Sequence, residues 1–194
     1  MRALLITCAV FLVSAPTVCA AENYTIDPTR SKIAFSVRHL LGAARGAFGK
    51  FSGTIAVDLD QPERSSVSVK IQVASIDTQI RKRDEHLLSA DFFDAKKFPE
   101  ITFRSRSVKR TAPNAGDIFG DLTMHGVTRP LTLHVKLVTP SAPALEAPAR
   151  TRWLVTCEPI RRKDFGLMFS ATAETISGIG QEVVPAIEIE AVRN

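Results

Sequence analysis

Hydrophobic and polar residues alternate with a period of two along most of the chain. Between residues 66 and 73, valines and an isoleucine share one face, while serine, lysine and glutamine share the other. The same alternation recurs in the segments 32–38, 55–60, 131–137 and 187–191. Antiparallel strands with one buried face and one solvent-exposed face have this pattern.

Turn signals separate these alternating segments. Pro, Gly or Asn residues interrupt the pattern at 61–63, 112–116 and 126–130, and such residues favour tight connections between strands. The stretch 139–148 is rich in Pro and Ala. It predicts a long surface loop rather than a domain boundary, because the alternation resumes after it. In total the pattern predicts about eight strands.

Many strands of similar length in one chain either stack as a sandwich or close as a barrel. Closure removes exposed strand edges, and an eight-stranded barrel is either filled by its own side chains or holds one small ligand. The alternation itself leaves these choices open. The 11 Phe residues against one Tyr and one Trp favour an apolar cavity with few polar groups. A plain packed core is the alternative.

One segment departs from the strand pattern and predicts a short inserted helix at residues 83–94. Asp84 is suited to cap its start. Leu88 and Phe92 are four residues apart, which gives the helix an apolar face. Pro99 follows and is expected to begin a new strand.

The first 20 residues have the features of an export signal. Arg2 precedes an uncharged apolar run, and small residues end the segment at Ala20. The run is shorter than the roughly 20 apolar residues that cross a bilayer. We therefore expect a signal peptide at 1–20, cleavage near Ala20, one mature domain at 21–194, and a periplasmic or secreted location. A membrane anchor and a lipoprotein attached at Cys19 are the alternatives.

Removal of that signal would leave Cys157 as the single cysteine of the mature chain. No intramolecular disulfide is then expected. A lone cysteine on a strand is typical of a small buried hydrophobic residue, so Cys157 is not expected to be catalytic.

The charge of the chain argues against a nucleic-acid partner. The formal net charge is +5, and basic and acidic residues are interspersed, except for a short basic step at 161–163. That step is too small for a nucleic-acid surface. It is expected to be a solvated turn, with transient contact with an anionic membrane surface as the alternative.

The arrangement of reactive residues does not predict an enzyme. The four His residues are scattered without metal-ligand spacing. Neither a Gly-x-Ser-x-Gly motif nor a complete dinucleotide-binding fingerprint occurs. We expect no catalytic residues, no metal and no cofactor.

Six ordered motifs resemble those of the YceI-like family. The first is YTIDPTRSKIAFSVRH at 24–39, followed by GAFGKFSG at 46–53 and RDEHLLSADFFD at 83–94. The others are FPEITF at 98–103, GDLTMHGVTRPL at 120–131 and RKDFG at 162–166. Together they extend over nearly all of the chain after residue 20.

The resemblance implies an all-β, extended lipocalin-like antiparallel barrel with one short helix. It also implies binding and carriage or storage of a long-chain polyisoprenoid lipid, of quinone or polyprenyl type, in an apolar cavity. The candidate cavity residues are Phe35, Val37, Phe48, Phe51, Leu88, Phe92, Phe93, Phe103, Leu122, Leu133 and Phe165.

The polar candidates have two interpretations. His39, Arg83, His86 and Arg162 are expected to contact a lipid headgroup at the cavity mouth. Asp84 and Asp164 are expected to form ion pairs that hold the helix against the barrel, and Arg side chains suit that role too. A homodimer is also compatible with the sequence. The alternative functions are a stress-related interaction module with an incidental cavity and, less favoured, an enzyme acting on an isoprenoid.

Two features depart from the family pattern. The segment 181–185 carries Gln181 where an acid is common, and Pro185 lies inside the last predicted strand. Because proline cannot donate to a ladder, that strand is expected to be an edge or bulged at Pro185. The loop at 139–148 also looks longer than usual. Either feature could alter the cavity mouth.

Overall fold

The computed structural model describes residues 21–58, 60–138, 150–169 and 178–194. The predicted signal peptide, Leu59 and the predicted loop at 139–148 lie outside the described residues. The described strands are β1 (Glu22–Ile26), β2 (Lys32–His39), β3 (Gly42–Phe48), β4 (Phe51–Val57), β5 (Ser66–Gln72), β6 (Ile76–Asp77), β7 (Glu100–Ala112), β8 (Ala115–Met124), β9 (Val127–Val138), β10 (Arg150–Thr156), β11 (Ile160–Arg161) and β12 (Glu182–Arg193).

Eight of these strands close an antiparallel barrel, which confirms the predicted fold. They are paired in the order β1, β4, β5, β7, β8, β9, β10 and β12, and β12 pairs back to β1. The ring combines hairpin neighbours, such as β8 and β9, with strands distant in sequence, such as β1 and β12.

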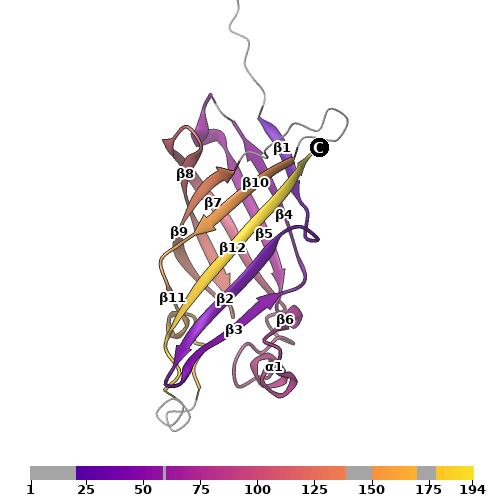
Figure 1. Cartoon of the computed structure of the whole chain (residues 1–194), viewed down its shortest axis with the longest axis vertical. Helices are drawn as coiled ribbons and strands as arrows, with labels where there is room; N and C mark the ends of the chain where they lie inside the picture. Colours follow the sequence, from indigo (N-terminus) through magenta and orange to yellow (C-terminus); the bar gives the residue numbers. More distant parts are fainter. Residues whose placement is uncertain (1–20, 59, 139–149, 170–177) are drawn as a thin grey trace, which may run out of the picture.

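The last strand, β12, extends the wall beyond the closed ring. Ala191–Arg193 pair with β1, whereas Val183–Glu188 pair with β2. From β2 the sheet continues through β3 to the short β6. Figure 1 shows β12 running diagonally across the barrel, with β6 and the helix at the end opposite the C-terminus.

The helix is shorter than predicted. α1 spans Arg81–Leu88, and Ile80 rather than Asp84 is its N-cap. Phe92 and Phe93 lie in the turns after the helix, where the amide of Phe93 donates to the carbonyl of Leu87. Three short 3-10 helices complete the described part: η1 (Pro62–Arg64), η2 (Val73–Ser75) and η3 (Arg162–Phe165). None of the described helices is long and apolar enough to cross a bilayer.

The β8–β9 connection is tighter than the predicted turn at 126–130. His125 and Gly126 form a two-residue turn with φ of 51° and 73°, and β9 begins at Val127. Two consecutive positive φ angles are typical of the turn that matches strand twist in a short hairpin. Pro130 lies inside β9, opposite Asp121.

The prediction for Pro185 is correct only locally. On one flank, Pro185 is paired with Phe35 of β2. On the other flank, however, β11 reaches only Val183 and β10 begins at Ile187. The proline therefore lies where one flank of β12 has no ladder partner, and its missing N–H leaves no ladder bond unmade.

An ionic cluster joins three strands where the barrel closes. The Arg150 guanidinium, at the start of β10, donates to Asp27 Oδ2 at 2.9 Å and to Glu190 Oε1 of β12 at 3.1 Å. Asp27 follows β1, and its amide donates to the Glu190 carbonyl at 2.8 Å. Hydrogen bonds from Thr29, then from Arg150, lower the pKa of Asp27 from 3.8 to about 2.

This cluster predicts a specific acid sensitivity. Because the folded-state pKa of Asp27 is depressed, its stabilising contribution is present above about pH 4 and is lost as pH falls towards about 2. Asp27→Asn should therefore flatten the fall in unfolding free energy over that range, measured by urea denaturation at stepped pH. Glu63→Gln, at an exposed position in η1, is the control and should leave the slope unchanged. An unaltered slope in Asp27→Asn would contradict the assignment.

Candidate ligand cavity

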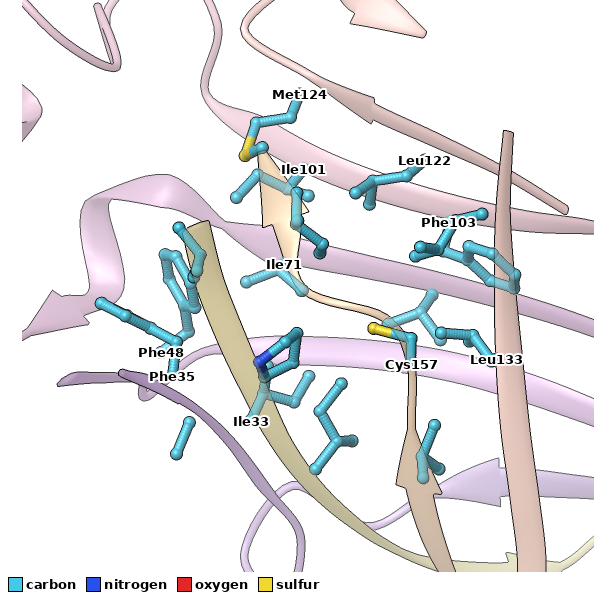
Figure 2. Close-up of a pocket in the computed structure, with 18 of the residues that line it drawn as sticks. Ile33, Phe35, Phe48, Ile71, Ile101, Phe103, Leu122, Met124, Leu133 and Cys157 are labelled. Atoms are coloured by element: carbon cyan, nitrogen blue, oxygen red, sulfur yellow. The ribbon is translucent and has the colours of Figure 1, made fainter. Parts of the chain in front are cut away.

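The barrel encloses an elongated apolar cavity of about 540 Å³, within the range of roughly 300–1,000 Å³ typical of small-molecule sites. All eight strands of the closed ring contribute lining residues, β1 through Ile26. Figure 2 shows the labelled side chains, among them Phe48, Ile71, Phe103 and Leu133, pointing into the same space.

Strand periodicity creates the lining. Val67, Val69 and Ile71 of β5 line the cavity, and so do Val183, Pro185, Ile187 and Ile189 of β12. Successive side chains of a strand point to opposite faces, so each strand supplies every second residue. At about 3.3 Å per residue, the lining part of β12 extends for about 20 Å. The apolar lining therefore follows β12 along the barrel rather than being confined to one end.

Most of the predicted cavity residues lie on this wall. Those that the structure places there are Phe35, Val37, Phe48, Phe92, Phe93, Phe103, Leu122 and Leu133. Whether they contact a ligand stays a prediction.

Three predicted cavity residues pack elsewhere. Phe51 and Phe165 are buried in the hydrophobic core, and Leu88 packs against it, but none of them lines the cavity. Phe51 lies at the first position of β4, and Phe165 lies in η3, where its carbonyl accepts a hydrogen bond from His125 Nδ1 at 3.0 Å.

The charged groups gather at one end of the cavity. Arg38, His39, Arg83 and Arg162 line it at the end formed by the β2–β3 hairpin, α1 and η3, and no acidic residue is among the described lining residues. His39, Arg83 and Arg162 were predicted there. Arg38 was missed, because strict alternation with Val37 would direct it to solvent. His86 was also predicted at the mouth, but it does not line the cavity: it is exposed, and its ring centroid lies 5.7 Å from that of Phe169.

Arg162 is buried, not part of a solvated turn as predicted. Its side chain is 2% exposed. The guanidinium donates to the carbonyls of Gly180 at 3.1 Å and Leu167 at 2.9 Å, and it lies 5.1 Å from the centre of the Phe169 ring. These hydrogen bonds offset the cost of burying the charge, and they join η3 to the segments that contain Leu167 and Gly180.

Thr78 joins α1 to the end of β6, and sequence reasoning missed it. The Thr78 amide and hydroxyl donate to Asp84 Oδ1 at 3.0 and 2.5 Å. Arg83 Nε donates to the Thr78 hydroxyl, and Arg83 Nη2 donates to its carbonyl, both at 2.8 Å. Asp84, predicted to form an ion pair that holds the helix against the barrel, instead accepts hydrogen bonds from Thr78. The backbone carbonyl of Asp164, which was also predicted to form an ion pair, accepts a hydrogen bond from Arg129 Nε at 3.1 Å.

Cys157 lies on the cavity wall between β10 and β11. Burial, and then the nearby Glu158 carboxylate, raise the pKa of its thiol to about 11. A protonated thiol in an apolar wall is a poor nucleophile. Among the described residues, no group of three or more His, Cys, Asp or Glu side chains is placed to hold a metal ion.

The chain is similar to known proteins over most of its length. The YceI-like domain family matches residues 24–191. A Pseudomonas putida protein named UPF0312 protein is 42% identical over 124 residues, which are 62% of this chain and 64% of that protein. The chain thus spans just under two thirds of that relative's length.

Two solved structures share the fold. BcnA of Burkholderia cenocepacia has a TM-score of 0.76 at 24% identity, covering 86% of this chain and 99% of that one. A polyisoprenoid binding domain from Saccharophagus degradans, described as implicated in plant cell wall breakdown, has a TM-score of 0.65 at 18% identity. That match covers 88% of this chain and 98% of that one.

The Thr78 contacts predict that the hydroxyl holds the helix in place. Thr78→Val keeps the shape of the side chain but removes the hydroxyl that donates to Asp84 and accepts from Arg83 Nε, and should lower the free energy of unfolding by about 1–3 kcal/mol. Thr128→Val, which removes a hydroxyl from an exposed pair, is the control and should change it by less than about 0.5 kcal/mol. Equal losses in the two variants, measured by urea denaturation, would contradict this role.

The environment of Cys157 predicts slow alkylation. With a pKa of about 11, about one thiol in a thousand is ionised at pH 8. Iodoacetamide should therefore label the folded protein at least about ten-fold more slowly than the protein unfolded in guanidinium. The folded rate should rise steadily between pH 8 and 10. Equal rates in both states, followed by mass spectrometry, would show an exposed thiol of ordinary acidity.

Proposed function

The chain belongs to the YceI-like domain family, and on this basis we propose that it binds and carries or stores a long-chain polyisoprenoid lipid, of quinone or polyprenyl type. The lipid chain occupies the barrel cavity. Support comes from the cavity described above and from a fold shared with a protein described as a polyisoprenoid binding domain.

The observation that carries this proposal is the nearly uniform apolar lining of an open interior. Branched aliphatic side chains from β5, β7, β8, β9 and β12 face one another across about 540 Å³ of space. A cavity lined in this way does not hold water well, because water needs polar partners. It suits a ligand that is itself apolar along its length.

The free energy of burying the lipid chain is suited to reversible carriage. Each methylene buried from water contributes about 0.8 kcal/mol, so even ten buried carbons contribute about 8 kcal/mol. A bilayer solvates the same carbons almost equally well, so transfer between membrane and cavity is close to balanced. The protein then shields the chain from water between membranes, or stores it.

The basic end of the cavity is suited to the more polar end of the ligand. Arg38, His39 and Arg83 present donors at the mouth, while Arg162 lies buried beside them. We propose that His39, Arg83 and Arg162 contact a headgroup, such as a quinone carbonyl or a phosphate oxygen. Both are acceptors that arginine and histidine can bind.

The insolubility of the proposed ligand in water bears on where the protein acts. A polyisoprenoid that moves between membranes must cross an aqueous compartment, and the predicted signal peptide at 1–20 matches that need. We propose that the domain at 21–194 acts in the periplasm or after secretion, following cleavage near Ala20.

The proposed activity is binding, not catalysis. Cys157, a nucleophile on the cavity wall, has its pKa raised rather than lowered, which opposes its activation. An interaction module with an incidental cavity, and an enzyme acting on an isoprenoid, are the outcomes that the following experiment separates from carriage.

Obstruction of the cavity should abolish lipid binding without unfolding the barrel. Leu133→Trp places an indole in the lumen from β9, and should weaken binding of a long-chain polyprenol and of a long-chain ubiquinone at least about ten-fold, because the ligand and the indole compete for the same space. Lys136→Trp puts the same ring on the exposed face of β9 and should bind as the wild type does. Binding is measured by equilibrium partition from detergent.

Three results would contradict the proposal. Unchanged binding in Leu133→Trp would place the ligand outside the cavity. No binding by the wild type would favour an interaction module. A ligand recovered in altered chemical form, identified by mass spectrometry, would favour an enzyme.

A further inference from the structure

The tip of the β2–β3 hairpin exposes two consecutive leucines. The pairing of β2 with β3 ends at His39 and Gly42, so Leu40 and Leu41 form a two-residue loop. They are 78% and 91% exposed, more than any other large hydrophobic side chain in the described part of the chain. Such loops normally carry Gly, Asn, Asp or Ser, so this pair is unusual for a turn.

The tip is held firmly in position. The Leu41 amide donates to His39 Nδ1 at 3.3 Å, and the Gly180 amide donates to the Arg38 carbonyl at 2.7 Å. A Cβ added at Gly178 would lie 3.1 Å from Leu40 Cβ, so the chain after β11 packs against the side of the hairpin. The two leucines thus project from a hairpin that is fixed by hydrogen bonds and packing.

The charged residues of the hairpin end itself are all basic. Arg38 lies two residues before the leucines, Arg45 lies on β3 three ladder positions from the loop, and both are exposed; residues 38–45 contain no acid. The whole chain carries a formal net charge of +5. Exposed apolar side chains between basic ones are typical of segments that lie in the interface of an anionic membrane.

The tip is also continuous with the cavity. Arg38 and His39 line the cavity and directly precede the two leucines. Figure 1 shows the hairpin tip and α1 at the same end of the barrel, and Ile80, which precedes α1, is 52% exposed. A surface that accepts the leucines would therefore face the polar end of the cavity.

We propose that the Leu40–Leu41 tip inserts into the interfacial region of an anionic phospholipid bilayer and seats the basic cavity mouth against it. The passage of a prenyl chain through that mouth rests on the proposed function, but the docking itself does not. A second copy of the chain is a poorer occupant. Two leucines on a narrow hairpin bury far less than the roughly 1,000 Å² of a stable interface, and two arginine-flanked tips repel each other.

Vesicle flotation tests this docking. The purified full chain is mixed with phosphatidylcholine vesicles that contain phosphatidylglycerol, and with vesicles of phosphatidylcholine alone. The wild type should float with the anionic vesicles and be released by high salt, which screens charge. Leu40→Ser with Leu41→Ser should lower the partition constant at least about ten-fold. Arg45→Gln should lower it about five-fold.

A matched double variant controls for general loss of apolar surface. Leu154→Ser with Phe119→Ser removes two side chains that are 39% exposed, on β10 and β8, and should float as the wild type does. The Leu40→Ser, Leu41→Ser protein should retain wild-type affinity for polyprenol in detergent, because neither leucine lines the cavity.

Several outcomes would overturn the docking. They are no flotation of the wild type, an equal loss in the control variant, and a concentration-dependent dimer in sedimentation that disappears in Leu40→Ser, Leu41→Ser. The proposed function fails separately: a wild type that floats but binds neither polyprenol nor ubiquinone would retain docking and exclude carriage.

Discussion

Successive side chains of a strand point to opposite faces, so a closed ring of strands directs every second residue into one shared interior. In this chain those residues are almost all apolar, and on β5 and β9 they are branched aliphatic residues that do not fill the space. About 540 Å³ remains open between them. A folded protein normally fills its interior to crystal-like density. The proposed role of this protein depends on this open apolar interior.

The two ends of the barrel are built differently. At the closing seam, Arg150 joins β1, β10 and β12 through charged hydrogen bonds. At the other end the ring opens into β2, β3 and β6, and the wall is completed by α1, which Thr78 ties down, and by η3, which Arg162 ties down. Basic side chains line the cavity at this second end, whereas mostly apolar side chains line the rest of it. This difference gives the cavity a direction, with an apolar body and a basic mouth.

Sequence patterns predicted the parts of this structure that depend on period and order. Alternation at 66–72 and 187–191 placed Val67, Val69, Ile71, Ile187 and Ile189 on one face, and these residues line the cavity. The parts that depend on where elements end could not be predicted in the same way. Arg38 lies next to the end of β2, where a side chain on the outer face can still reach the cavity mouth. Phe51 and Phe165 are aromatic like Phe35 and Phe103, but they pack at element ends. The sequence did contain a signal for the exposed pair Leu40 and Leu41. Tight turns favour Gly, Asn, Asp or Ser, so two leucines at a turn indicate a role outside the turn itself.

The most direct test of the account is a lipid extract of the protein purified without detergent from the compartment in which it is made, analysed by mass spectrometry. The account predicts a prenyl-chain species at close to one molecule per chain. An extract without any such lipid, from protein whose interior proves to be filled by its own side chains, would contradict it.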